Sequence, residues 1–210
     1  MVKKRSRTVK DTKAHILDAA DDIFVRRGTD GARMQEIADR AGVNKSLVHY
    51  YFRTKADLAR AVWLRIATSY APGIFHMMAS DVPLDRKIDE FVDAYFTTLK
   101  RHPYLPAYVV SEVARRPALL RGFYTAERRT TARRMVLKLQ SQIRDHTRKR
   151  KMAPVAAEQF LVTMWSACVL PFAARPVTSA LLGLSPKDFD RFIARRRREL
   201  PAFLKRGLRL

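Results

Sequence analysis

The chain has 210 residues, of which 47% are hydrophobic, so it can bury a sizeable core and global disorder is not expected. Lys and Arg number 42 against 20 Asp and Glu, and this formal charge of +22 favours nucleic acid, anionic lipid or an acidic ligand as a partner. The single cysteine, Cys168, excludes an intramolecular disulfide and fits a reducing cytoplasm. No apolar run follows the basic N-terminus, and the longest apolar stretch, Val162 to Ala174, is too short for a membrane span, so we expect a cytoplasmic protein without stable membrane insertion.

The first predicted element is a helix that ends at Gly28. Its apolar residues follow helical spacing, and Gly28 occupies the position after the last turn, where glycine is favoured. Thr8 with Asp11 three residues later could open this helix as a capping box. The apolar positions are Ile16, Ala20, Ile23 and Phe24.

Three further helices follow closely. A short apolar stripe from Met34 to Ala41 is closed by Gly42, and Asn44 is a good N-cap for a third helix through Tyr51. Thr54 with Asp57 predicts the start of a fourth helix.

The remainder of the chain also reads as helices. Apolar residues recur at steps of three and four over residues 84–101, and shorter or Pro-flanked patterns follow. We expect helices over about 103–114, 119–151, 154–173 and 186–206. No run shows the alternation of a half-buried strand, so the predicted fold class is all-α.

The second and third helices, joined by the tight turn "AGVN", make a helix-turn-helix. In the third helix Leu47, Val48 and Tyr51 can face a small core. This leaves a cation, a hydroxyl, an imidazole and a phenol pointing outward, a set that suits base edges and phosphates in a major groove. Lys55, in the first turn of the next helix, is well placed beside a phosphate bound at a helix N-terminus. The four outward residues are Lys45, Ser46, His49 and Tyr50.

The segments "ILDAADDIFVRRG", "MQEIADRAGVN" and "KSLVHYYFRTKADL" resemble the DNA-binding domain of the TetR family of transcriptional regulators. The resemblance runs without a gap over about a quarter of the chain. It implies a three-helix DNA-binding domain over residues 8–58, joined by a linking helix to a helical effector-binding and dimerisation domain over residues 59–210. The resemblance also implies that the protein is a ligand-responsive repressor, which binds a palindromic operator in double-stranded DNA as a homodimer.

Several positions depart from the family pattern. The usual Thr cap before the second helix is replaced by Ala32, and Arg33 is expected to take over its phosphate contact. The motif's Gly is Ser46 and its first Tyr is His49, so the operator sequence cannot be borrowed from relatives. Asn44 completes the predicted DNA-binding set, together with Lys4 and Arg5 of the N-terminal arm, which could instead be a solubility tail.

The resemblance also assigns roles in the second domain. The helices over 154–173 and 186–206 would form a four-helix dimer interface, with contacts from Phe172, Phe189, Phe192 and Ile193. A small effector, anionic or hydrophobic, would bind among residues that could equally be plain core. These are Phe91, Tyr95, Tyr104, Tyr108, Met135, Trp165 and Cys168.

The block from Arg115 to Lys151 holds 13 Lys and Arg against 2 Asp and Glu. It could be a solvated Arg-rich face, the mouth of a pocket for an anionic effector, or a contact with flanking DNA or an anionic membrane surface. A charge-driven, nonspecific nucleic-acid or membrane-surface binder is therefore the alternative function.

An enzyme is not expected, and neither is a cofactor or a metal. The sequence contains no phosphate-binding glycine loop, no H-E-x-x-H motif and no paired carboxylates in an apolar run.

Overall fold

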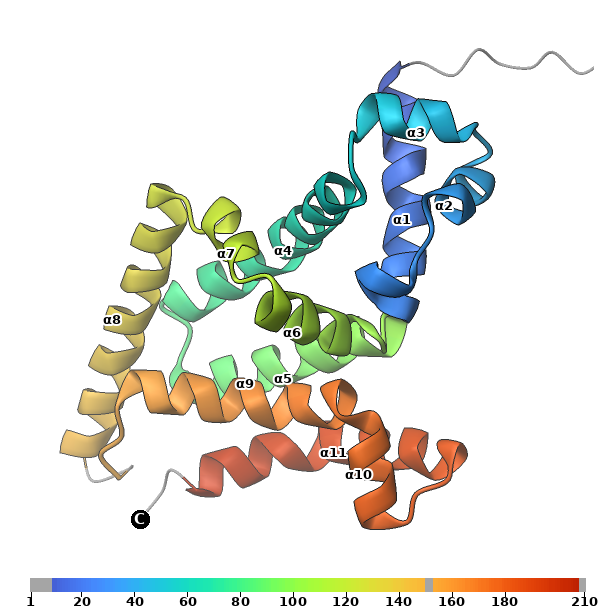
Figure 1. The fold of residues 1–210 in the computed structure, drawn as a ribbon. Helices are drawn as coiled ribbons and strands as arrows, with labels where there is room; N and C mark the ends of the chain where they lie inside the picture. Colours follow the sequence, from blue (N-terminus) through green and yellow to red (C-terminus); the bar gives the residue numbers. More distant parts are fainter. Residues whose placement is uncertain (1–8, 150–152, 208–210) are drawn as a thin grey trace, which may run out of the picture. The chain divides into compact units, whose positions relative to one another are not determined.

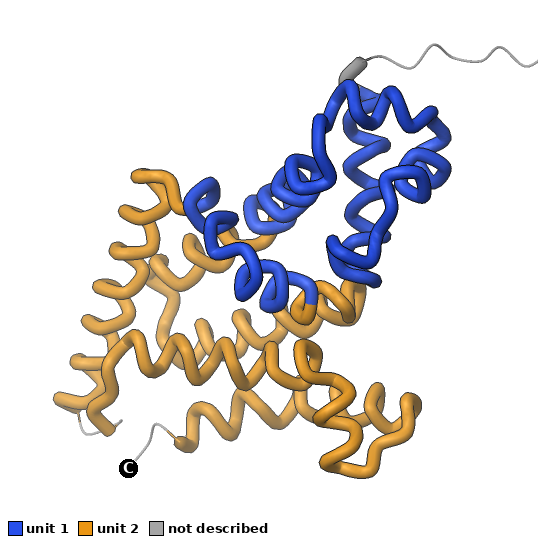
Figure 2. The backbone as a smooth tube through the Cα atoms, in the orientation of Figure 1, with its two compact units in different colours: residues 1–68, 108–123 blue, residues 69–107, 124–210 orange. Residues whose placement is uncertain are grey.

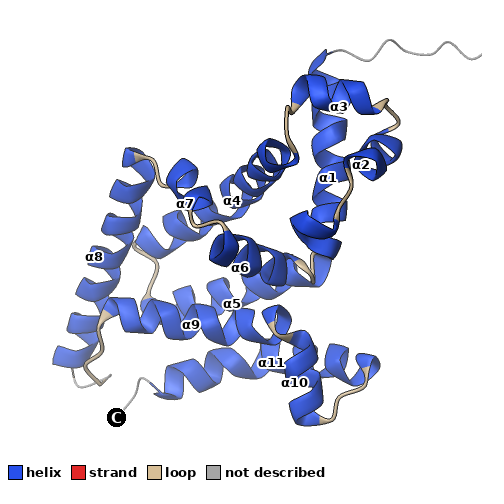
Figure 3. Cartoon of the chain, viewed as in Figure 1, coloured by secondary structure: helices blue, strands red, loops and turns tan. Residues whose placement is uncertain are grey.

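The computed structural model describes residues 9–149 and 153–207, and these ranges consist of helices and connecting loops with no strand (Figures 1 and 3). The all-α prediction is confirmed. In chain order the helices are α1 (Val9–Gly31), α2 (Met34–Ala41), α3 (Lys45–Tyr51), α4 (Lys55–Ala79), α5 (Leu84–Arg101), α6 (Leu105–Arg115), α7 (Ala118–Phe123), α8 (Ala126–Arg148), α9 (Ala157–Ala173), α10 (Arg175–Leu182) and α11 (Pro186–Gly207).

The predicted end of the first helix at Gly28 marks a break inside α1. Gly28 has φ 72° and ψ 163°, and a further helical turn follows it up to Gly31. Any residue with a Cβ would be strained at this φ, so the sequence places glycine where the chain changes direction. The predicted cap Thr8 lies outside the described residues.

The predicted capping residues of α2, α3 and α4 are confirmed. Gly42 ends α2 in the left-handed conformation, with φ 66°. The side chain of Asn44 accepts a hydrogen bond from the Leu47 N–H at 2.8 Å. Thr54 accepts the Asp57 N–H at 3.0 Å, and its own hydroxyl donates to the Asp57 carboxylate at 2.8 Å.

One prediction for the second half of the chain is wrong, and one helix there was not predicted. The single helix expected over 119–151 is interrupted at Tyr124 and Thr125, because Thr125 caps a new helix by accepting the Arg128 N–H at 3.3 Å. The break separates α7 from α8. The sequence pattern also missed α10, which has no buried residue and therefore no apolar stripe directed at a core.

The described chain divides into two compact units (Figure 2). Unit 1 comprises residues up to 68 together with 108–123, and unit 2 comprises 69–107 together with 124–210. Both α4 and α6 thus contribute to each unit. The predicted boundary between residues 58 and 59 concerns function, and the two predicted domains stay a prediction.

The core of unit 1 is built where α1, α2 and α3 meet. Phe24, Ile37 and Val48, one from each of the three helices, are fully excluded from solvent. On the outer side of α1, Arg65 of α4 donates to the carboxylates of Asp18 at 2.6 Å and Asp21 at 2.8 Å. The small core and these ion pairs hold the helix-turn-helix on α1.

The core of unit 2 is larger and apolar, with α5, α8, α9 and α11 all contributing. One cation is buried at its edge: the Lys87 ammonium donates to the carbonyls of Met78 at 2.6 Å and Ser80 at 2.8 Å, and to the Gln142 side chain at 2.9 Å. Burial lowers the pKa of Lys87, and the three acceptors supply the hydrogen bonds that water would otherwise give. Lys87 thereby fastens the end of α4 to α5 and α8.

In the described ranges no individual helix has both the length and the apolar composition of a membrane span. Among the described helices, the consecutive pair α9 and α10 has the length and apolar composition of a span when taken together, but the pair is bent by 83°.

Candidate nucleic-acid interface

The turn between α2 and α3 is fixed by backbone hydrogen bonds. The N–H of Gly42 donates to the Asp39 carbonyl at 3.1 Å, and that of Val43 donates to the Ala38 carbonyl at 3.0 Å. Asn44 then starts α3 by capping Leu47. Because carbonyls at the end of α2 and an N–H at the start of α3 are satisfied locally, the angle between the two helices is set by the sequence itself.

The short helix α3 separates its side chains into two faces. Val48 is fully buried, and Leu47 and Tyr51 are half-buried. Lys45, Ser46, His49 and Tyr50 are all exposed, and 77% of the Tyr50 surface is accessible. The structure therefore places the four predicted outward residues together on the solvent side of α3.

Polar groups also surround the start of α2. Arg33 precedes the helix, is exposed, and makes no side-chain cap, so the first N–H groups of α2 have no capping side chain. Within the described ranges the Arg33 guanidinium has no carboxylate partner. Free N–H groups at a helix N-terminus and a nearby cation are the groups that bind a backbone phosphate.

The side chain of Lys55 makes contacts within the chain that the sequence did not suggest. Its ammonium donates to the carbonyls of Asp30 and Ala32, both at 3.1 Å, and so fastens the loop after α1. A lysine ammonium has three donors, which leaves one for a phosphate. Lys4 and Arg5 lie outside the described residues.

The sequence of this chain is similar to those of known regulatory proteins. Residues 16–62 match the family model described as bacterial regulatory proteins, tetR family. The transcriptional regulator RutR of Escherichia coli K12 is 25% identical over 185 residues, covering 88% of this chain and 85% of RutR. The transcriptional activator FasR of Mycolicibacterium smegmatis is 33% identical over 86 residues, covering 41% of this chain and 39% of FasR. This chain belongs to the TetR family.

Solved structures agree with this assignment at the level of the fold. The fatty acid degradation regulator FadR of Bacillus halodurans superposes with a TM-score of 0.59 at 15% identity, over 93% of this chain and 96% of FadR. A mutant of HlyIIR gives a TM-score of 0.63 at 19% identity, over 96% and 98% of the two chains. The structures support the fold alone, and it is the family match over residues 16–62 with the likeness to RutR that makes the protein a DNA-binding, helix-turn-helix transcriptional regulator of the TetR family.

In this TetR-family chain, unit 1 contains a polar joint between the end of α1 and α6, which is buried at Thr29 and Glu112 and exposed at Asp30 and Arg115. The Glu112 carboxylate is 1% exposed, accepts the Thr29 N–H at 3.2 Å, and is paired with Arg116. Arg116 and Arg115 also donate to Asp30, at 2.5 and 2.9 Å. The hydrogen bond and charge of Arg116, helped by Arg115, lower the pKa of Asp30. We call these five residues the α1–α6 joint.

Sequence reasoning missed the α1–α6 joint. The ion pairs of Asp30 join residues 85 and 86 positions apart, which no local pattern reveals. One local signal was present, since Glu112 is the single acid of α6 and is followed by Arg116 at the i,i+4 position.

Five of the predicted effector residues meet inside unit 2. Phe91, Met135 and Cys168 are buried in its core, and Tyr95 packs against it. Tyr95 stacks on Phe91 with ring centroids 5.2 Å apart and accepts a hydrogen bond from the Trp165 indole at 2.8 Å. Burial raises the pKa of both Tyr95 and Cys168 to about 12, so both are neutral at physiological pH.

The other two predicted effector residues lie elsewhere. Tyr104 is on the loop before α6 and is 47% exposed. Tyr108 belongs to unit 1, where it is 3% exposed and burial raises the pKa of its hydroxyl. The predicted set is therefore not one cluster.

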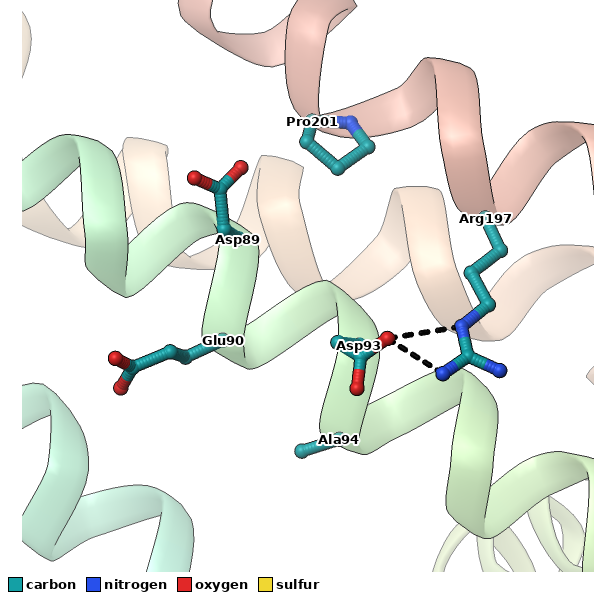
Figure 4. A pocket seen from close by; sticks show the side chains of 6 residues that line it. All are labelled: Asp89, Glu90, Asp93, Ala94, Arg197 and Pro201. Atoms are coloured by element: carbon teal, nitrogen blue, oxygen red, sulfur yellow. Dashed lines mark hydrogen bonds and ion pairs between the residues drawn. The ribbon is translucent and has the colours of Figure 1, made fainter.

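A surface groove of unit 2, about 500 Å³ in volume, contains none of the predicted effector residues (Figure 4). It lies between α5 and α11, and Arg197 crosses it to donate to Asp93 at 3.0 Å. Lys205 neutralises Asp89, with one N–O distance of 2.6 Å. The groove is thus bordered by ion pairs within the chain. Its lining residues are Asp89, Glu90, Asp93, Ala94, Arg197 and Pro201.

The predicted dimer contacts divide into two groups. Phe172 and Phe189 are 5% and 2% exposed and pack edge-to-face, with ring centroids 6.3 Å apart, so a second copy could cover little of them. Phe192 and Ile193 are half-buried. A dimer interface on this part of the chain therefore has to use other side chains as its main contacts.

Proposed function

We propose that this TetR-family regulator is a ligand-responsive repressor that binds a palindromic operator as a homodimer, with α3 as its recognition helix. The observation that carries the proposal is the solvent face of α3, on which Lys45, Ser46, His49 and Tyr50 stand opposite the buried Val48. Lys45 suits guanine O6 and N7, and Ser46 and Tyr50 suit phosphates or either base edge. Asn44 and Arg33, at the starts of α3 and α2, would position the backbone phosphates.

Exposed apolar side chains support the homodimer. Seven of the large apolar residues exposed in the described ranges lie on α9, α10 and α11 of unit 2. Clusters of exposed apolar residues are typical of protein interfaces. No residue of α10 is buried within its own chain. The seven are Val162, Trp165, Leu170, Val177, Leu181, Leu182 and Phe203.

The recognition proposal is tested by selecting bound sequences from a pool of random duplexes. The expected product is an inverted repeat whose half-sites are separated by one helical turn of DNA, about 34 Å. The variant with Lys45→Ala and Tyr50→Ala should enrich no sequence while keeping its helical circular dichroism. Enrichment of the same repeat by this variant would remove α3 from the interface.

The homodimer is tested by analytical ultracentrifugation of Val162→Asp with Leu181→Asp. Both side chains are exposed in the chain, at 60% and 81%, so these substitutions should leave the fold intact. The variant should sediment as a monomer and bind the selected repeat weakly. Phe203→Asp alone, 68% exposed on α11, examines whether the last helix shares the interface.

The effector would be a small hydrophobic or anionic molecule bound beside Tyr95 and Trp165, and ligand would favour a dimer spacing that no longer fits the operator. The support is the aromatic and apolar lining of that cluster, with Trp165 44% exposed at its edge. The probe is 1-anilinonaphthalene-8-sulfonate, which is both apolar and anionic. In Trp63→Phe, where Trp165 is the remaining donor, energy transfer to the probe is expected and Trp165→Phe should abolish it.

Charge-driven, nonspecific binding is a second candidate, favoured by the Arg-rich solvent face of α8. It predicts equal affinity for the selected repeat and a scrambled duplex at every salt concentration. The repressor proposal predicts a clear preference for the repeat.

A further inference from the structure

The solvent face of α8 is a row of arginines. The exposed positions of α8 from residue 133 onward are four arginines, one leucine and one serine, and none is acidic. Met135, Leu139 and Ile143 on the opposite face are buried in unit 2. We call the exposed set the α8 basic face. Its members are Arg133, Arg134, Leu137, Ser141, Arg144 and Arg148.

Three of these cations are not neutralised within the described part of the chain. Arg148 is paired with Asp145. Arg133, Arg134 and Arg144 have neither a carboxylate nor a hydrogen-bond acceptor among the described residues. By contrast, on α11 Arg191 is paired with Asp188 and Arg195 with Glu199. Among the described residues many surface arginines are thus paired, whereas these three are not.

We propose that the α8 basic face binds the phosphate backbone of duplex DNA outside the contacts of α3, either flanking DNA or a second segment. Arginine forks bind phosphate oxygens bidentately. A duplex carries about one phosphate charge per 1.7 Å of its axis, so its backbone presents anions along the whole row. The proposal does not depend on α3 reading a groove.

The length of the row disfavours a small anion. Arg133 and Arg144 are eleven residues apart, which is about 16 Å along a helix at about 1.5 Å per residue. A single phosphate or carboxylate group can contact one end of the row but not both. A polyanion is therefore the complementary partner.

The apolar side of α8 disfavours a lipid surface. Amphipathic helices that bind membranes insert their apolar face between the headgroups. In α8 that face is already buried in unit 2, and Leu137, 59% exposed, is the one apolar residue of the basic face. Adsorption to lipid would rest on charge alone, without the insertion that makes it specific.

The test compares two variants that each remove two charges: Arg133→Gln with Arg144→Gln on the α8 basic face, and Arg191→Gln with Arg195→Gln as the matched control. Binding to a random-sequence duplex is followed by fluorescence anisotropy between about 50 and about 200 mM salt. Each phosphate contact contributes about 0.9 to the slope of log K against log salt. The α8 variant should lose nearly two units of slope, and the control should match the wild type.

Two outcomes would overturn the proposal on this duplex. Equal losses in both variants would show that net charge acts without a defined surface, and an unchanged slope in the α8 variant would show that the row does not touch DNA. Helical circular dichroism and thermal melting should match the wild type in both variants, since all four side chains are exposed.

Vesicles of phosphatidylcholine and phosphatidylglycerol in equal parts distinguish the lipid alternative. If the α8 variant no longer binds the vesicles while its slope of log K against log salt for the duplex is unchanged, the partner is lipid and the proposal fails. Repeating the duplex measurement with Lys45→Ala and Tyr50→Ala separates it from the recognition proposal. The α8 effect should persist there even though sequence preference is lost.

Discussion

Within each of the two units an apolar core packs the helices, but the polar contacts beside that core differ. In unit 2, α5, α8, α9 and α11 meet through an apolar core with one cation, Lys87, at its edge. In unit 1, α6 is fixed to the end of α1 by Glu112, Arg116 and Asp30, through directional hydrogen bonds and ion pairs. Apolar burial is non-directional and tolerates small shifts, whereas a buried hydrogen bond such as that from the Thr29 N–H to Glu112 is satisfied in one geometry and costly when broken.

This difference suggests a division of labour. In unit 1 the polar joint gives the end of α1 a single satisfied geometry relative to α6, while α3 rests on the small apolar core. In unit 2, where we propose that a small hydrophobic or anionic effector binds, the large apolar core packs through contacts without direction. The predictions below test the contrast, beginning with the largest expected effect.

The core of unit 2 is tested by two substitutions on α8. Leu139 is fully buried and Leu137 is 59% exposed, so the pair differs in burial but not in chemistry. Leu139→Ala should lower the free energy of unfolding by about 3 kcal/mol, through lost apolar burial and the cavity left behind. Leu137→Ala should change it little. Urea denaturation measures both, and equal effects would contradict the packing described for α8.

The α1–α6 joint is tested by Glu112→Ala with Glu199→Ala as its control. Both glutamates pair with an arginine four residues away, but Glu112 is buried and Glu199 is exposed. Glu112→Ala should cost about 2 kcal/mol, because the Thr29 N–H loses its acceptor in a buried place. Glu199→Ala should cost about 0.5 kcal/mol or less. A small loss at Glu112 would mean that the joint does not hold unit 1.

The start of α3 is tested by Asn44→Ala. The substitution removes the acceptor for the Leu47 N–H and should cost about 1 kcal/mol of local stability. Amide hydrogen exchange should increase within the seven residues of α3 before other parts of unit 1 respond. Unchanged protection of α3 would show that the cap is dispensable.

The pH dependence of the joint is tested by Asp30→Asn. Arg116 and Arg115 lower the pKa of Asp30 below its ordinary value of 3.8 in the folded chain. A depressed carboxyl pKa stabilises the folded state above the unfolded pKa, and this contribution is lost as the pH falls through the folded pKa. The wild type should therefore be more stable than Asp30→Asn at neutral pH, and the difference should shrink below pH 3.8. A difference that stays constant with pH would exclude the ion pairs as its cause.

Local signals account for what the sequence predicted correctly. Asn44, Gly42 and Thr54 act on neighbours within a few residues, so the boundaries of the helix-turn-helix and the outward face of α3 follow from the sequence alone. The break between α7 and α8 was not predicted, because Thr125 is a cap inside a run with strong helical character. Five of the predicted effector residues meet, but their packing as core depends on contacts between distant helices.

What the sequence missed depends on contacts across the fold. Arg116 meets Asp30 only after α6 has packed in unit 1, and Lys55 turns to the Asp30 carbonyl instead of solvent. Phe172 and Phe189 carry the apolar pattern of an interface helix, yet the chain buries them itself. The exposed apolar residues of α10 were hidden from the pattern because α10 has no core-facing stripe.

The most direct measurement is the affinity of the Lys45→Ala, Tyr50→Ala variant for the inverted repeat that the wild type selects, relative to a scrambled duplex at one fixed salt concentration. If the outer side of α3 reads base edges, the two duplexes should become equivalent for the variant while its sedimentation stays that of the wild type. A variant that still prefers the repeat by the wild-type ratio would contradict the account.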